Sequence, residues 1–242
     1  MAGNTLKGSN TLKGSQLTLG VRLHDEATFA NFLGERNVPA AEKLRALVED
    51  NSLPVIVVCG DSGTGKSHLL QAVCHHAEHQ GRSALCLNLA ELATLGPQVL
   101  QGMETFERVC LDDIEAVAGD AHWEEALFHL FNRMLDNGHQ LIVSAGQPPA
   151  RIDIRLGDLA SRLQHGVVIQ LSLPRDEDRL LILGTRAERR GLFLPEDVSR
   201  FILRRAPRHT GELLAILERL DEGSLREQRR LTIPFVKSMM GW

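Results

Sequence analysis

Short apolar runs alternate with stretches of helical periodicity from residue 54 onwards. Five runs have the length and branched side chains of buried strands, namely residues 55–59, 84–89, 108–111, 140–144 and 167–171. Between them, residues 66–78 and 123–135 carry apolar positions at helical spacing. Alternating strands and helices predict an α/β fold in which a parallel sheet is covered on both faces.

The pattern changes at Pro174, after which no strand-like run is found in the sequence. Helices are predicted at about 175–190, 195–206, 209–222 and 232–240. We therefore expect a base domain over residues 22–173 and a small all-helical domain over residues 174–242. Residues 1–15 repeat NTLKGS and are polar, which predicts a flexible tether, although a cloning linker has the same composition.

Bulk properties exclude several classes of protein. A net charge of −4 and a pI near 6.2 disfavour broad coating of nucleic acid, so a connection with DNA is expected to be indirect. The four cysteines have no zinc-site spacing, which favours reduced thiols in the cytosol. The sequence shows neither a signal peptide nor an apolar run of membrane-spanning length, and we expect a cytoplasmic protein.

The strongest chemical motif follows the first predicted strand. It reads GDSGTGKS, matches G-x-x-x-x-G-K-[ST] in full, and stands between a strand and a helix. Its glycines let backbone N–H groups point at a phosphate, and the helix N-terminus adds partial positive charge. Lys66 is expected to neutralise the β- and γ-phosphates, and Ser67 to hold Mg²⁺. The predicted nucleotide-binding residues of this segment are Gly60, Asp61, Ser62, Gly63, Thr64, Gly65, Lys66, Ser67 and His68.

Two adjacent acids end the run at 108–111. A P-loop needs an acid at the end of a neighbouring strand, so Asp112 is predicted on the magnesium side and Asp113 as the group that polarises the attacking water. The alternative is that both acids only cap the next helix. Asp113 is shorter than the glutamate of many such ATPases, and slow intrinsic hydrolysis is therefore expected.

Several segments together resemble a known family. GDSGTGKS, VCLDDIEAVAGD, WEEALFHLFNRML, LIVSAGQPPA, DLASRL and LTIPFVK resemble the AAA+ module of the DnaA initiator family. Their order, with LTIPFVK near the end, is most similar to the related Hda family of DnaA regulatory inactivators. The resemblance covers nearly the whole chain from residue 16, and its specific part is DLASRL combined with LTIPFVK. It implies an AAA+ αβα sandwich with a five-stranded parallel sheet, followed by a helical lid.

The resemblance also implies roles for single residues. Arg162 in DLASRL matches the arginine finger, which reaches the nucleotide of a neighbouring subunit; on sequence alone it would be a surface arginine. Residues 16–21, QLTLGV, resemble the peptide that binds the DNA polymerase III β sliding clamp in a groove. The clamp-binding residues would be Gln16, Leu17, Leu19 and Val21. The alternative is a loosely packed lead-in, and Gly20 stands where the family often has proline.

Two departures from the family pattern concern catalysis. Gly146 stands where the family has an acidic sensor after the fourth strand, and Ser144 is the nearest polar substitute. In the lid, the sensor arginine falls on Gly211, and Arg208 is the nearest cation. Both departures predict weak hydrolysis of the chain's own nucleotide.

The resemblance implies a regulator of replication initiation. Holding ADP or ATP with Mg²⁺, the chain would reach DNA through the clamp and stimulate hydrolysis of DnaA-bound ATP, as a homo-oligomer at the nucleoid rather than as an independent enzyme. An alternative is a helicase loader, which needs competent hydrolysis and a longer N-terminal segment than a tether and one helix near 39–49. A truncated initiator is disfavoured because no basic helix-turn-helix follows the lid in this sequence.

Overall fold

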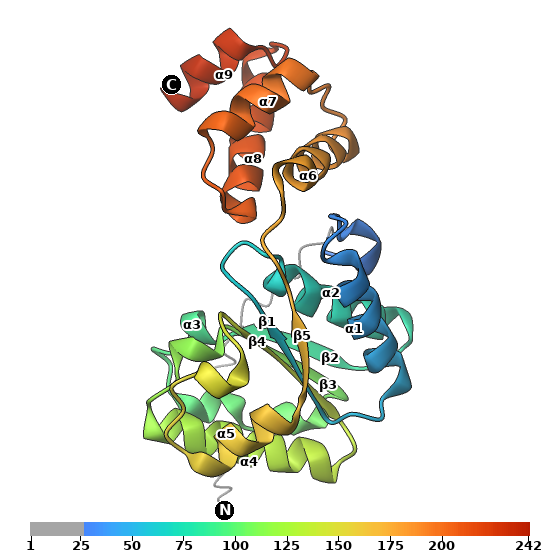
Figure 1. Cartoon of the computed structure of the whole chain (residues 1–242), viewed down its shortest axis with the longest axis vertical. Helices are drawn as coiled ribbons and strands as arrows, with labels where there is room; N and C mark the ends of the chain where they lie inside the picture. The colour runs from blue at the N-terminus through green and yellow to red at the C-terminus, as the bar shows by residue number, and fades with distance from the viewer. Residues whose placement is uncertain (1–26) are drawn as a thin grey trace, which may run out of the picture.

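The computed structural model describes residues 27–242, which form an α/β base with a smaller helical domain above it (Figure 1). The base strands are β1 (Val55–Cys59), β2 (Ala84–Asn88), β3 (Arg108–Asp112), β4 (Gln140–Ala145) and β5 (Val167–Gln170). Its helices are α1 (Val38–Asp50), α2 (Lys66–His79), α3 (Leu89–Leu92), α4 (Ala121–Asp136) and α5 (Gly157–His165). Short 3₁₀ turns lie at η1 (Phe29–Asn31), η2 (Pro97–Leu100), η3 (Met103–Thr105), η4 (Ile114–Ala116) and η5 (Pro149–Arg151).

The five strands form one parallel sheet in the order β2-β3-β4-β1-β5. The predicted parallel sheet is confirmed. One expectation about it is wrong, because β3, which carries the acids, is not the neighbour of β1: β4 lies between them. Alternating strands and helices predict the crossovers but do not determine where a later strand inserts.

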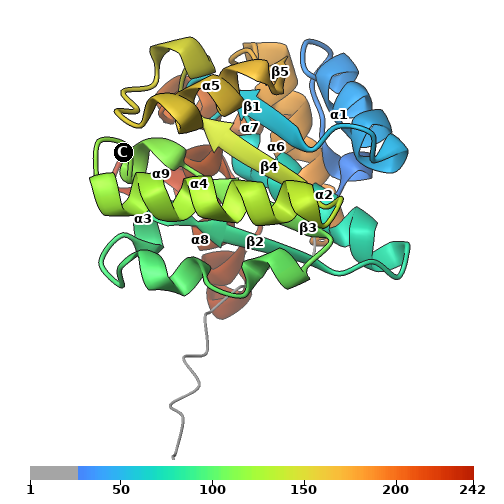
Figure 2. The same cartoon turned by 90° about the horizontal axis from the view of Figure 1, so that it is seen from below.

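Alternate residues of each strand face different helices, because successive side chains point to opposite faces of a sheet. On β1, Val57 belongs to the core cluster with α4 and α5, whereas Ile56 and Val58 belong to the cluster with α1 and α2. All five residues of β1 are buried. Seen from below, α4 and α5 lie at the end of the base away from the lid (Figure 2).

The predicted strand at 84–89 is one residue too long. Leu89 begins α3, because the side chain of Asn88 accepts hydrogen bonds from the backbone N–H groups of Ala90 (2.9 Å) and Glu91 (3.3 Å). This N-cap makes Asn88 the last strand residue and starts the helix directly after it. Asn88 also pairs with Asp112 across the β2–β3 ladder, so the turn lies beside the predicted acids.

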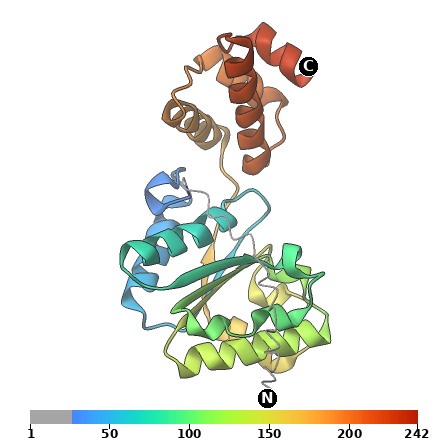
Figure 3. The same cartoon turned by 180° about the vertical axis from the view of Figure 1, so that it is seen from behind.

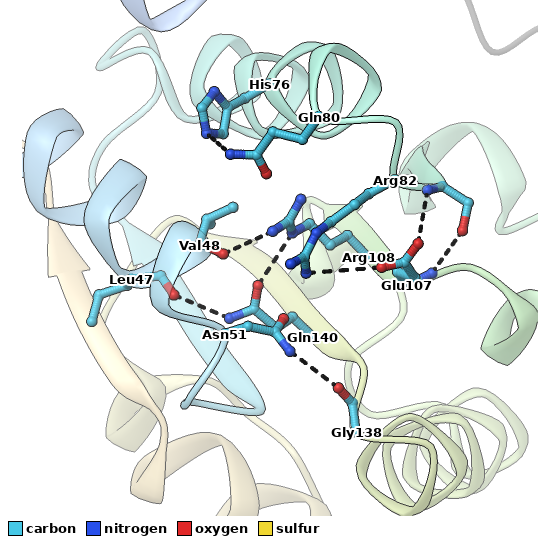
Figure 4. A network of polar contacts seen from close by, with 11 residues as sticks. Leu47, Val48, Asn51, His76, Gln80, Arg82, Glu107, Arg108, Gly138 and Gln140 are labelled. Carbon is cyan, nitrogen blue, oxygen red and sulfur yellow. Dashed lines mark hydrogen bonds and ion pairs between the residues drawn. The ribbon is translucent and has the colours of Figure 1, made fainter.

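A buried arginine anchors α1 to the sheet (Figure 4). Arg108 is fully buried; its Nη2 donates to the Val48 carbonyl at 2.8 Å and its Nε to Gln140 Oε1 at 3.3 Å. Gln140 Nε2 in turn donates to the Leu47 and Leu53 carbonyls, each at 3.1 Å. Two of the carbonyls that the end of α1 leaves unpaired are satisfied in this way, and the cation complements the negative end of the helix.

The upper domain, or lid, has its own core. Its helices are α6 (Asp176–Arg189), α7 (Glu196–Arg205), α8 (Thr210–Glu227) and α9 (Ile233–Met240). Each overlaps a predicted helix, and α8 runs five residues beyond the predicted end at 222. Buried lid residues pack with one another in a cluster that includes no buried residue of the base. From behind, the loop between β1 and α2 is seen reaching up toward the lid (Figure 3).

Two sequence predictions fall outside the described residues. They are the tether at 1–15 and the clamp-binding residues Gln16, Leu17, Leu19 and Val21. Within residues 27–242, no helix is long and apolar enough to cross a membrane. The four cysteines are free, and each is at least partly buried, which agrees with the predicted reduced thiols.

Candidate nucleotide site and arginine finger

The predicted P-loop joins β1 to α2 as a tight turn. Lys66 Nζ donates to the carbonyls of Gly60 (2.7 Å) and Asp61 (3.1 Å), and Thr64 Oγ1 donates to the Asp61 carbonyl at 2.8 Å. Gly65 has φ +100°, and a Cβ there would lie 2.7 Å from Cε2 of Phe32. Glycine is therefore required at 65 both by the backbone conformation and by the ring packed against it.

Two cavities lie on either side of this loop. One of about 720 Å³ opens at the carboxyl ends of the strands and contains Lys66, Ser67, Asp112 and Asp113. A second of about 270 Å³ lies between the loop, the segment around Phe32 and the lid. Each of the nine predicted residues from 60 to 68 lines at least one of the two cavities. The fold therefore brings the nine predicted residues together around these two cavities.

The two acids are held differently. Asp112 is 7% exposed and accepts a hydrogen bond from the hydroxyl of Ser144 on β4, and Ser144 Oγ accepts from the Asp113 N–H at 2.9 Å. Asp113 is exposed, with φ +61°, and its side chain does not cap the turn that follows. The helix-capping alternative therefore fails for Asp113. Ser144 does not line either cavity and instead orients Asp112 from the intervening strand.

Sequence reasoning missed one acid of the first cavity, Glu115. Glu115 Oε1 accepts a hydrogen bond from the Gly146 N–H at 2.5 Å, and both residues line the cavity. A carboxylate therefore stands beside Gly146, where the family has an acidic sensor, but it comes from the turn after β3. The only signal in the sequence was the acid three positions after Asp112, and the contact across to the end of β4 depends on the fold.

On the lid side, the structure does not bring Arg208 to the site. Arg208 is exposed, lines neither cavity, and has no hydrogen bond or ion pair within residues 27–242. Its neighbours contact the loop instead: His209 Nε2 lies 2.9 Å from Ser62 Oγ, and Thr210 Oγ1 donates to the Gly63 carbonyl at 2.8 Å. Sequence reasoning missed both residues, because a histidine and a threonine before a helix signal only a cap.

His68 connects α2 to the segment that begins the described chain. Its Nε2 lies 2.8 Å from the Thr28 carbonyl, and its ring packs edge-on against Phe32. Burial lowers the pKa of His68 to about 4. The imidazole is therefore neutral near pH 7, with the proton on Nε2 donated to Thr28.

Arg162 lies on α5, at the end of the base away from the lid (Figure 1). Its guanidinium carbon is 5.6 Å from the ring centroid of Phe128 and 5.0 Å from that of Phe131. Arg162 lines a third cavity of about 380 Å³ that has no residue in common with the two cavities at the P-loop. The predicted finger is thus separated from the nucleotide site of its own chain.

Two family models match the chain. The model described as the Hda lid domain matches residues 176–240, which cover nearly the whole of α6 to α9. The model described as the bacterial DnaA ATPase domain matches residues 98–170, from the turn before β3 to the end of β5. The second match includes Asp112, Ser144 and Arg162.

Solved structures of DnaA and of the branch migration motor RuvB share the fold. Domain III of the replication initiation protein DnaA from Thermotoga maritima superposes with a TM-score of 0.78 at 21% identity, over 91% of this chain and 98% of that one. A replication initiator DnaA bound to AMPPCP and single-stranded DNA gives 0.68 at 25% identity, over 86% and 69%. The Holliday junction branch migration motor RuvB of Thermotoga maritima gives 0.67 at 16% identity, over 90% and 72%. With its five-stranded parallel sheet, helical lid and two family matches, the chain is a Hda- and DnaA-like AAA+ protein.

Proposed function

We propose that this chain regulates replication initiation by stimulating, in trans, the hydrolysis of ATP held by DnaA. The observation that carries the proposal is the separation of Arg162 from the chain's own P-loop. A guanidinium that lies away from the nucleotide site of its own chain can instead contact the nucleotide of a neighbouring protein. The Hda-like lid and the DnaA-like ATPase segment support DnaA as that neighbour.

In this proposal the chain binds its own adenine nucleotide, ADP or ATP, at the P-loop. Lys66 neutralises the phosphates, while the Ser67 hydroxyl and the Asp112 carboxylate face the same cavity and suit Mg²⁺, which prefers oxygen ligands. Asp113 is exposed and lines the same cavity, and within residues 27–242 no lid residue lines that cavity. The nucleotide bound by the chain itself therefore promotes assembly of the protein and is hydrolysed only slowly.

Arg162 acts on the γ-phosphate of DnaA-bound ATP. Charge that develops on the transferred group is stabilised by the planar guanidinium, which can be worth roughly three to five orders of magnitude in rate. The faces of Phe128 and Phe131 restrict the guanidinium before it meets the phosphate, so less conformational freedom is lost on contact. Hydrolysis by each protein alone is slower than the stimulated reaction. Turnover of DnaA-bound ATP therefore depends on contact between the two proteins.

The same proposal gives the chain a location. Gln16, Leu17, Leu19 and Val21 bind the DNA polymerase III β sliding clamp, which tethers the chain to DNA at the nucleoid without broad DNA contact. Nucleotide-bound chains associate as homo-oligomers, as is common for AAA+ modules. A clamp pull-down with Gln16→Ala and Leu17→Ala tests this part, and retention of binding by both variants removes the peptide from the proposal.

A single-turnover assay tests the catalytic part. DnaA loaded with labelled ATP is mixed with this chain and clamp-loaded DNA, and conversion to ADP is followed. Wild type is expected to accelerate conversion, Arg162→Ala to lose roughly a thousandfold of that acceleration, and the matched control Arg155→Ala, an exposed arginine outside DLASRL, to retain it. No acceleration by wild type, or full acceleration by Arg162→Ala, would refute the proposed function.

A further inference from the structure

The lid contacts the P-loop at the start of α8. Ser62 and Gly63, in the middle of the loop, are contacted by His209 and Thr210 respectively. The approach is close: a Cβ on Gly63 would lie 3.1 Å from the Cα of His209 and 3.1 Å from the backbone nitrogen of Thr210. Any side chain at 63 would push the lid away from the loop.

One imidazole ring joins the two parts. Nδ1 of His209 accepts a hydrogen bond from the Glu212 N–H at 3.3 Å, which makes His209 the N-cap of α8. A nitrogen that accepts cannot carry the proton, so the proton is on Nε2 and is donated to Ser62 Oγ. The same ring therefore caps the lid helix and binds the phosphate loop.

Side chains of α6 hold His209 in this place. Arg179 is 2% exposed, and its Nη2 donates to the Pro207 carbonyl at 2.5 Å, two residues before His209. Its neighbour Asp178 accepts from the N–H groups of Glu35 and Arg175, each at 3.0 Å. The turn that carries His209 is thus braced by α6, which is itself bonded to Glu35 in the segment before α1.

The imidazole also occupies the position where a sensor side chain would start. A Cβ on Gly211 would lie 3.0 Å from Cε1 and 3.2 Å from Nδ1 of the His209 ring. A side chain at 211 would therefore require the His209 ring to move by a few tenths of an ångström. At the start of α8, the lid contacts the loop through the His209 ring and the Thr210 hydroxyl.

We propose that His209 is the residue by which the lid recognises the nucleotide-loaded P-loop, so that binding of a purine nucleoside di- or triphosphate is coupled to the position of the lid. The inference rests on the proposed nucleotide binding but not on any action upon DnaA. His209, Thr210 and the loop all line the 270 Å³ cavity. A nucleotide that orders the loop from within strengthens the contacts the lid makes from outside, and coupling of this kind is reciprocal.

Calorimetric titration of the whole chain with Mg²⁺–ADP tests the coupling. His209→Asn keeps an N-cap residue but shortens the reach to Ser62, so we expect an unchanged melting temperature without nucleotide and about tenfold weaker ADP binding. The matched control is Arg208→Ala, which removes the exposed neighbour and is expected to bind ADP within about twofold of wild type.

Amide exchange gives a second readout that a purely structural role would not change. Addition of ADP is expected to slow exchange in the first turn of α8 in wild type but not in His209→Asn. ADP binding within about twofold of wild type by His209→Asn, or equal protection of α8 in both proteins, would overturn the inference about His209 alone. Absence of ADP binding by wild type would overturn the proposed nucleotide site as well.

Discussion

The two functional ends of the base hold their charged groups in opposite ways. At the P-loop end, the side chains already have protein partners: Lys66 donates to loop carbonyls, Asp112 accepts from Ser144, and His209 bonds Ser62. At the other end, within residues 27–242, the guanidinium of Arg162 has no hydrogen bond or ion pair and lies only against aromatic faces.

This difference indicates that the P-loop end is arranged to hold a nucleotide and that the other end is arranged to present the Arg162 guanidinium. The P-loop end is hollow, lined by residues of both domains, and braced by hydrogen bonds. The arginine end keeps all five N–H donors of Arg162 available for bidentate contact with a phosphate. Since the cavity at Arg162 shares no residue with the two cavities at the P-loop, one chain is equipped to hold one nucleotide and to act on another.

The largest effect on ADP binding is expected from removing the cation of the P-loop. Lys66→Ala should weaken ADP binding by roughly a hundredfold, because a charge-assisted contact to the phosphates is lost. Calorimetry measures the affinity, and Lys43→Ala, on the exposed side of α1, is the control that should bind as wild type. A Lys66→Ala protein with near-normal affinity would mean that the nucleotide site is elsewhere.

A smaller effect is expected when the pH is lowered far enough to protonate His68, near the P-loop. The pKa of His68 is lowered to about 4 by burial, below its ordinary value of 6.5, so the unfolded chain takes up the proton first as pH falls. The stability that the neutral imidazole contributes is complete above about pH 6.5 and is lost progressively toward pH 4. Between about pH 6.5 and pH 5 the free energy of unfolding should fall by about 2 kcal/mol through this group.

Urea unfolding at about pH 7.5 and pH 5 measures this loss. His68→Gln retains a donor for the Thr28 carbonyl but does not titrate, and it should lose less stability on acidification than wild type. His129→Gln, on the exposed side of α4, is the matched surface control. Equal acid sensitivity of wild type and His68→Gln would contradict the burial argument.

The smallest effect is expected from changing an aromatic ring beside Arg162. Phe128→Leu removes one of the two ring faces beneath Arg162 and should slow the stimulated turnover of DnaA-bound ATP by about threefold, with ADP binding by the chain itself unchanged. Phe193→Leu replaces a ring that is 80% exposed on the lid and should have no effect on turnover. A weaker affinity for ADP in Phe128→Leu would show that the two ends are not independent.

Local patterns in the sequence predicted most of the fold and the core of the site. The branched apolar runs predicted all five strands to within one residue at each end, because buried parallel strands must be apolar on both faces. GDSGTGKS predicted the loop, since its chemistry depends on adjacent residues. Contacts between distant segments were not predictable: the insertion of β4 between β1 and β3, the Glu115 carboxylate at Gly146, and His209 over Ser62 all depend on tertiary packing.

The central claim is that the two ends serve two different nucleotides, and two readouts on one variant test it most directly. ADP affinity and turnover of DnaA-bound ATP are measured on the same preparation of Arg162→Ala. The account predicts an ADP affinity within about twofold of wild type together with turnover at the rate of DnaA alone. A fall of about tenfold or more in the variant's own ADP affinity, or turnover equal to that with wild type, would contradict it.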